Sequence, residues 1–183
     1  MTNHVVVSER AGQANAAQGS ERLHTLVVLV NDRPGGVDRV VGLLRRRRAR
    51  MQTLAIVRSE LPEVVRITVV VDDSEVHADQ LVEQLRKVAD VTHIVNLSAE
   101  QAVARELALV KVNCTSTNLN EIIELGHLCG AHAVDITPQT VTLEVTGSEE
   151  KVARLIDLLQ PYGVREVART GRVAMARSLE SDT

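Results

Sequence analysis

Residues 23–51 read LHTLVVLVNDRPGGVDRVVGLLRRRRARM, and this stretch decides the fold. Its first part, residues 23–30, is apolar and rich in β-branched side chains, which is typical of a strand. A loop follows at residues 31–36. The next segment predicts a helix that runs to about Arg48, because apolar residues recur there at the spacing of one helix face: Val37, Val40, Val41 and Leu44.

The loop between this strand and this helix contains Pro34, Gly35 and Gly36. Such residues adopt backbone shapes that other residues resist. The loop ends at a helix N-terminus, where free N–H groups and the helix dipole favour a small anion such as a carboxylate. Many strand-to-helix turns contain glycine and bind nothing, so the pattern leaves both interpretations open.

The pattern continues outward from this stretch for about 75 residues. Residues 52–58 and 65–71 predict two strands of a hairpin, with Pro62 in the turn between them. A second one-sided apolar helix begins near Ala78, and residues 91–97 predict a fourth strand. The order β-α-β-β-α-β is the split β-α-β unit called ferredoxin-like.

The same order then repeats. The predicted segments are a strand at 106–114, a helix opened by an Asn118–Glu121 capping box and ended at Gly130, a hairpin at 134–136 and 141–145, a helix capped by Gly147-Ser148 and stopped at 161–163, and a strand-rich segment at 164–175. The fold class is therefore α+β, with two tandem ferredoxin-like (βαββαβ) domains at 22–98 and 106–177. We expect a polar linker at 99–105 and tails at 1–21 and 178–183, the first of them disordered. Because helices cover only one face of such sheets, we also expect self-association.

Composition excludes several classes of protein. The chain has 183 residues, a net charge of −3, one Tyr, and neither Phe nor Trp, so its cores must be aliphatic and its overall charge does not favour nucleic acid. No apolar run approaches the roughly 20 residues that cross a bilayer. The N-terminus lacks the apolar segment of a secretory signal, and two cysteines make no disulfide framework. We expect a cytoplasmic protein that binds neither membrane nor nucleic acid.

Two side-chain clusters suggest functions that we weigh against simpler explanations. The arginine run at 45–50 has no interleaved aromatic residue for base stacking, and cations are favoured at a helix C-terminus. A solvated helix end, or a surface facing a protein partner, explains it better than nucleic acid. His127, Cys129 and His132 are close in sequence, but Gly130 interrupts the helix between them, so we predict no metal site. We find no signature of catalytic residues.

Two sets of residues resemble known families. Residues 26–44 resemble the opening of an ACT domain, the amino-acid-sensing form of the ferredoxin-like unit. A second set resembles the small regulatory subunit of acetolactate synthase, also called acetohydroxyacid synthase: Arg105-Glu-Leu-Ala-Leu-Val-Lys-Val112, Val134-Asp-Ile-Thr-Pro138, Leu143-Glu-Val-Thr-Gly147 and Glu166-Val-Ala-Arg-Thr-Gly-Arg-Val173. The resemblance covers about residues 22–177 and makes the first domain an ACT domain.

This resemblance implies a non-catalytic subunit without cofactors of its own. The large catalytic subunit of that family carries thiamine diphosphate, magnesium and FAD. The small subunit raises its activity and confers feedback inhibition by branched-chain amino acids, chiefly valine. The resemblance also implies a homodimer through the ACT domains, with the amino-acid effector between the loop of one copy and the start of the second strand of the other.

The resemblance also assigns effector-binding residues. Backbone N–H groups around Gly35, Gly36 and Val37, which follow Pro34, are expected to bind the effector carboxylate. Asp32 is expected to accept from its ammonium group, while Val30 and Met51 line a slot for its side chain.

This sequence departs from the family before the second strand. The family has Gly-aromatic-Asn-Ile there, and this chain has Arg48-Ala-Arg-Met51, so that Arg50 replaces an Asn that contacts the effector. Burying an unpaired cation is costly. Either Asp32 pairs with Arg50 across the interface, or the site binds another ligand or none. We expect weakened valine inhibition with activation retained.

Two other functions remain open from the sequence. The first is a free-standing amino-acid sensor of the ACT type that works without a large subunit. The second is an enzyme in its own right. Copurification with a thiamine-diphosphate enzyme distinguishes the first, and turnover of pyruvate by this chain alone distinguishes the second.

Overall fold

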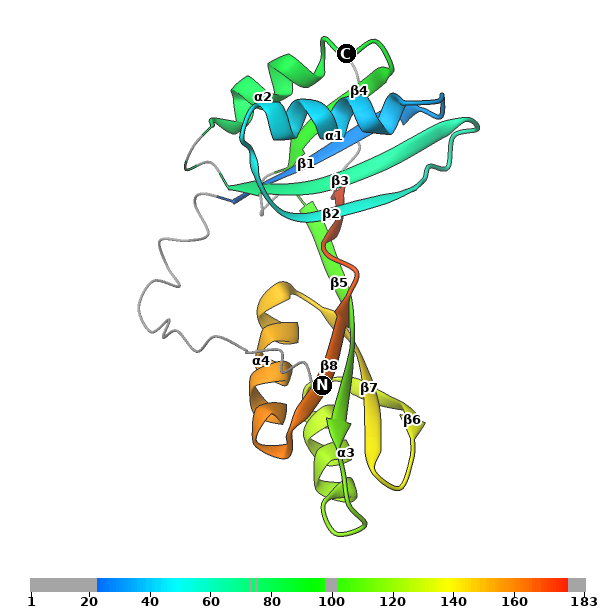
Figure 1. Cartoon of the computed structure of the whole chain (residues 1–183), viewed down its shortest axis with the longest axis vertical. Helices are drawn as coiled ribbons and strands as arrows, with labels where there is room; N and C mark the ends of the chain where they lie inside the picture. Colours follow the sequence, from blue (N-terminus) through cyan, green and yellow to red (C-terminus); the bar gives the residue numbers. More distant parts are fainter. Residues whose placement is uncertain (1–22, 73, 75, 98–101, 178–183) are drawn as a thin grey trace, which may run out of the picture.

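The structure is a computed structural model that describes residues 23–72, 74, 76–97 and 102–177. The tails predicted at 1–21 and 178–183 lie outside these residues. The described part forms two antiparallel sheets, one in each half of the chain, and each sheet has two helices over one face (Figure 1). This confirms the predicted α+β fold with two βαββαβ units.

The first unit has the bounds β1 Leu23–Asn31, α1 Gly36–Arg46, β2 Arg50–Arg58, β3 Val64–Asp72, α2 Ala78–Leu85 and β4 Val91–Leu97. Its sheet order is β2-β3-β1-β4. Alternate residues of the strands face the helices, for example Val28 of β1 and Ile67 of β3, and both are fully buried. They pack against Val40 and Leu44 of α1. The alternating apolar residues of the strands and the one-sided apolar residues of the helix therefore form a single aliphatic core.

The second unit has the bounds β5 Ala102–Asn113, α3 Leu119–Leu128, β6 Ala131–Ile136, β7 Thr140–Gly147, α4 Glu149–Leu159, the 3₁₀ turn η2 Gln160–Tyr162, β8 Val164–Arg169 and β9 Val173–Ala176. Its main sheet order, β6-β7-β5-β8, places corresponding strands as in the first unit. Val110 and Leu143 on the sheet pack against Ile122 of α3 and Leu155 of α4 in a second, separate core.

The linker predicted at 99–105 is wrong from residue 102 onward, because β5 begins at Ala102. This first part of β5 pairs with β9, from Ala102 opposite Ala176 to Arg105 opposite Val173. Ala102 and Ala174 are small enough to pack on the open face of the first sheet, against Val27 and Leu97. Sequence periodicity missed this segment, since its partner strand lies about 70 residues further along the chain.

The two helix-start predictions have different outcomes. The Asn118 carboxamide oxygen accepts from the Thr115 backbone N–H at 2.7 Å and makes no bond to the helix, so the capping box is wrong. Glu121 instead accepts from the Tyr162 hydroxyl at 2.7 Å. The Ser148 cap is confirmed, because its hydroxyl accepts from the Lys151 N–H at 3.3 Å.

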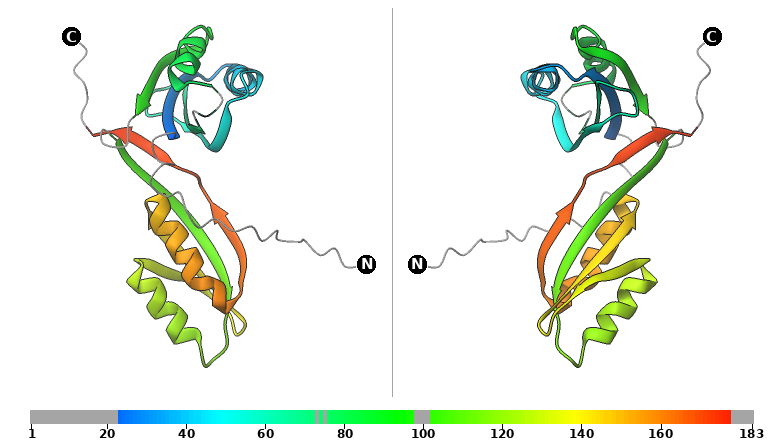
Figure 2. Two further views of the ribbon diagram at one scale, coloured as in Figure 1. Left: turned by 90° about the vertical axis from the view of Figure 1, so that its left-hand side faces the viewer. Right: turned by 90° about the vertical axis from the view of Figure 1, so that its right-hand side faces the viewer.

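A ribbon of β5 and β9 connects the two halves and lies beneath the open face of the first sheet (Figure 2). Arg66 of β3 donates to the Ala174 carbonyl at 2.7 Å. Arg172 donates to the Thr25 hydroxyl at 3.3 Å and to Glu149, at the start of α4, at 2.8 Å. The chain's own ribbon therefore covers part of the face on which we expected another sheet, while self-association stays a prediction.

Close to this ribbon, a partly buried ion pair joins β5 to the end of β8 within the second sheet. Glu106 is 4% exposed and accepts two hydrogen bonds from Arg169, at 2.5 and 2.7 Å. The hydrogen bond to Glu106 raises the pKa of Arg169. Such a two-point contact fixes the orientation of both side chains.

Candidate functional site

The loop between β1 and α1 is fastened to its neighbours by backbone hydrogen bonds. The Asn31 N–H donates to the Asp90 carbonyl and the Asp32 N–H to the Glu63 carbonyl, both at 2.8 Å. The Gly36 N–H donates to the Arg33 carbonyl at 2.9 Å. The loop is thus held in one shape before any ligand binds.

These bonds correct the expected donor set. Gly36 uses its amide within the loop, so it is not available to a carboxylate. A Cβ on this residue would lie 2.9 Å from the Asn31 carbonyl oxygen, so its role is to permit close packing of helix on strand. Among the described residues, the amides of Gly35 and Val37 have no acceptor, and they remain the candidate donors. Gly35 is the helix N-cap, with a φ of 81°.

Arg39 is a residue of this site that sequence reasoning missed. Its Nε donates to the Asp90 carboxylate at 2.7 Å, and Asp90 is nearly buried. A Cβ on Gly35 would lie 3.1 Å from Arg39 Nη1, so the guanidinium stands beside the loop. A cation in the first turn of a helix is unfavourable because it opposes the helix dipole. The position of Arg39 in the sequence could therefore have indicated that it has a partner or a function. Because Asp90 compensates this positive charge, Arg39 helps to hold the loop in place and does not supply a free cation for an anion.

The remaining loop residues are open to solvent. Pro34 and Asp32 are exposed. Within the described part of the chain, the Asp32 carboxylate has no hydrogen-bond or ion-pair partner. It is therefore able to accept from a ligand ammonium. Val30, by contrast, is fully buried in the core, so the expectation that it lines a ligand slot is wrong.

Arg50 and Met51, the other predicted site residues, lie at the opposite end of the sheet. In the strand register, Arg50 is opposite Asp72 and Asp72 is opposite Leu23, whereas the loop follows Asn31 at the far end of β1. Nine-residue strands at 3.3 Å per residue put roughly 25 Å between these ends. A single copy cannot bring Asp32 and Arg50 together, so a site with both needs two copies.

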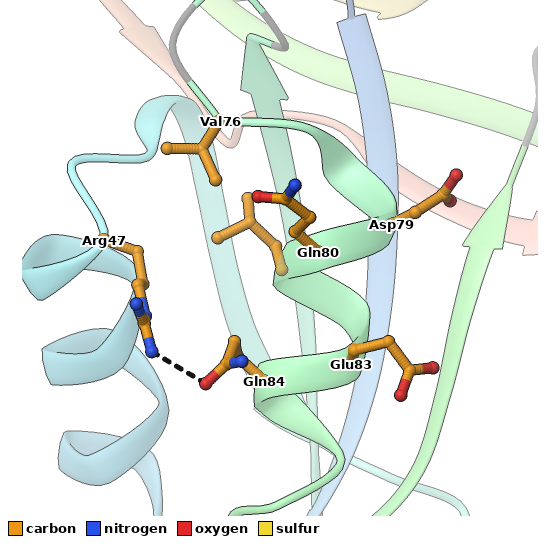
Figure 3. Close-up of a pocket in the computed structure, with 7 residues that line it drawn as sticks. Arg47, Val76, Asp79, Gln80, Glu83 and Gln84 are labelled. Carbon is orange, nitrogen blue, oxygen red and sulfur yellow. Dashed lines mark hydrogen bonds between the residues drawn. The ribbon is translucent and has the colours of Figure 1, made fainter.

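The start of β2 has an unusual backbone. Arg48 has a φ of +56°, a left-handed conformation that favours glycine. Met51 is partly buried against the first core, while Arg50 is exposed. Next to this corner, α1 and α2 enclose a shallow hollow of about 300 Å³ (Figure 3). There Arg47 reaches over to Gln84 and donates to its side-chain oxygen at 2.8 Å.

His127 and His132, which were close in sequence, are also neighbours in the structure. The rings of His127 and His132 have centroids 6.2 Å apart. Nowhere in residues 23–72, 74, 76–97 and 102–177 do three His, Cys, Asp or Glu side chains gather as metal ligands would. No helix within these ranges is long and apolar enough to span a membrane.

Comparison with known proteins gives consistent matches in both halves. Residues 26–93 match a family model described as the AHAS small subunit-like ACT domain, and residues 105–178 match one described as the small subunit of acetolactate synthase. The acetolactate synthase small subunit of Mycolicibacterium smegmatis is 40% identical over 154 residues, which are 84% of this chain and 91% of that protein. The probable acetolactate synthase small subunit of Archaeoglobus fulgidus is 38% identical, with 84% and 96% covered.

A solved structure is similar over nearly the same length. The crystal structure of the acetolactate synthase small subunit from Thermotoga maritima superposes with a TM-score of 0.79 at 31% identity. The match covers 86% of this chain and 99% of that one. Both domains and their order are therefore shared with a protein of known structure.

Proposed function

Because this chain belongs to the family of acetolactate synthase small subunits, we propose that it activates a large catalytic subunit and adjusts its activity to an amino-acid effector. The chain supplies surfaces and an effector site. The large subunit supplies thiamine diphosphate, magnesium and FAD, and condenses pyruvate with a second 2-oxo acid.

One observation carries the regulatory part of the proposal. The candidate effector residues stand at opposite ends of one sheet, with Asp32 and Gly35 at one end and Arg50 and Met51 at the other. The strand between those ends, β2, is an edge strand. If β2 of two copies runs antiparallel, each copy's Arg50 approaches the other copy's loop. Effector binding and assembly are then thermodynamically linked, as feedback control requires.

The effector is recognised by its charged groups in this proposal. The amides of Gly35 and Val37 bind the carboxylate. Asp32 accepts from the ammonium group, and the partner's Met51 contacts the side chain. Arg50 brings a cation to a site that in the family has an amide. We therefore propose that the response to valine is weaker than is typical of the family and that activation is retained.

The decisive experiment measures acetolactate formation by the cognate large subunit, with and without this chain, across a series of branched-chain amino acids. We expect turnover to rise when the chain is added and to respond weakly to valine. The chain alone should form no acetolactate. Unchanged large-subunit turnover would overturn the proposal. In that case, amino-acid binding by the isolated chain would favour a free-standing sensor.

A further inference from the structure

The short segment between β8 and β9, residues 170–172, lies against the strands that carry the candidate effector site, and we call it the link. Thr53 of β2 and Thr25 of β1 are both opposite Val70 of β3, so the three residues form one row across the open face of the first sheet. Gly171 packs on Thr53, and Arg172 donates to the Thr25 hydroxyl at 3.3 Å. The link therefore contacts both ends of this row.

The row is close to the candidate effector residues at the start of β2. One residue separates Met51 from Thr53, and the register of β2 against β3 shifts between these two positions. Such irregularities are over-represented next to functional sites, where they re-aim a side chain. A ligand that displaces Met51 therefore acts on Thr53 through a single residue, and Thr53 is in contact with Gly171.

Arg172 holds the second domain more firmly than the first. Its guanidinium donates to the Glu149 carboxylate at 2.8 Å, whereas Thr25 is a neutral acceptor at the longer distance of 3.3 Å. Hydrogen bonds between opposite charges are shorter and stronger than those between neutral groups. When the first sheet shifts against the link, the contact with Thr25 is therefore the one that breaks.

Glu149 connects Arg172 to the interior of the second domain. It lies in the first turn of α4, where the helix dipole favours a carboxylate. The pKa of Arg169 is raised first by its hydrogen bond to Glu106, and the charge of Glu149 also contributes. The charged groups thus continue from Arg172 through Glu149 and Arg169 to Glu106, a buried residue of β5.

The remaining contacts between the two domains involve other strands of the first sheet. The two domains have separate aliphatic cores. Ala102 and Ala174 of the ribbon pack on β1 and β4, and Arg66 of β3 donates to the Ala174 carbonyl at 2.7 Å. The link adds a contact with β2, which begins at Arg50, and a hydrogen bond to β1, which leads into the effector loop.

From these observations we propose that the link couples the effector site to the second domain, with Arg172 as the positioning residue. The inference rests on the proposed function and adds the part of the chain that transmits the regulation. Its two states are the link with and without the contact between Arg172 and Thr25. A ligand at the start of β2 shifts the row, changes the populations of these states, and so changes how α4 is held.

Hydrogen–deuterium exchange of the full chain tests the coupling without a ligand. Thr25→Val removes the acceptor in the first domain with little change of shape. It should speed exchange in residues 149–155 of α4 at least about threefold, because Arg172 loses one of its two contacts. In an Arg172→Met background, Thr25→Val should have no further effect there. Equal acceleration in both backgrounds, or none in either, would overturn the proposal.

A second experiment uses valine as the probe and measures acetolactate formation by the complex with the large subunit. Arg172→Met should keep the dissociation constant for valine within about threefold and lower the inhibition at saturating valine at least about twofold. Arg172→Lys retains a cation and should restore part of the inhibition. Arg165→Met is the matched control, because Arg165 donates to Asn113 within the second domain, and it should leave the inhibition unchanged.

The outcomes separate this inference from the proposed function. Full inhibition by valine in Arg172→Met would contradict the coupling, and so would a loss of valine binding in this variant, since the link would then shape the site itself. If no amino acid affects the natural complex, the effector part of the proposed function fails. The exchange experiment without ligand still decides in that case whether the link couples the two domains.

Discussion

Gly171 lies directly against Thr53, so that a Cβ on Gly171 would come within 3.1 Å of the Thr53 Cβ. Thr53 belongs to β2 of the first sheet, and Gly171 to the short link between β8 and β9, which run in the same direction along β5. The neighbouring Arg172 joins Thr25 of β1 to Glu149 of α4. The link between β8 and β9 therefore contacts the first sheet both by close packing and by a hydrogen bond.

Gly171→Ala should destabilise the protein by about 1–3 kcal/mol, because the φ of +76° disfavours a side chain and the new methyl group meets Thr53. Urea unfolding measures the change in the free energy of unfolding. Gly42→Ala is the matched control: it lies inside α1, where its Cβ would meet only the far end of Arg46, and alanine should stabilise by about 1 kcal/mol. Equal effects at both positions would contradict the packing argument.

Thr53→Val should stabilise the protein by about 1 kcal/mol. The Thr53 hydroxyl is buried without a hydrogen-bond partner among the described residues, and valine replaces it with a methyl group of similar size. Thermal unfolding of the two proteins tests this. Thr53→Ser keeps the hydroxyl and loses the methyl, so it should lower stability. A loss of stability in Thr53→Val would mean that the hydroxyl has a partner.

Arg48→Gly should raise the free energy of unfolding by about 1 kcal/mol, since it relieves the left-handed backbone at φ +56°. The measurement is chemical denaturation at low protein concentration, where association contributes least. Arg45→Gly removes the same charge from a regular helical position in α1 and should destabilise by about 1 kcal/mol. If both variants are destabilised alike, the strain at Arg48 is not relieved by glycine.

Tyr162 is the single tyrosine of the chain, so its titration can be followed by absorbance. Its hydroxyl donates to Glu121, which raises the pKa of Tyr162 above its usual range. Because the folded protein holds this proton more tightly than the unfolded chain, the contribution to stability is complete below the unfolded pKa. It is lost as pH rises through the folded pKa. Glu121→Gln should return the pKa toward the ordinary value of about 10, and an unchanged titration would contradict the assignment.

Arg50→Asn should increase valine affinity by about tenfold or more, because it restores an amide and removes a cation that competes with the ligand ammonium for Asp32. Isothermal titration calorimetry of the two proteins measures the dissociation constants. Arg46→Asn removes a nearby charge outside the predicted site and should have little effect. Micromolar binding of valine by the natural chain would contradict the proposed role of Arg50.

The sequence by itself determined most of the secondary structure and the order of its elements. Period-2 alternation in segments such as residues 64–72 and one-sided apolar spacing in α1 are local properties, and each unit buries its own core with neighbours close along the chain. The resemblance of residues 26–44 and of the C-terminal segments to known families was also visible in the sequence, and the comparisons confirm it.

Only the tertiary structure decided how these elements meet. The start of β5 is a strand because it pairs with β9 and because its small residues pack on the first sheet. Since β9 lies far along the chain, local sequence patterns do not predict this pairing. Gly36 changed from an expected donor into a packing contact once the Arg33 carbonyl was seen to accept its amide. The register placed Asp32 and Arg50 at opposite ends of one sheet. This strand pairing, this hydrogen bond and this register depend on contacts between distant segments, which local sequence patterns do not predict.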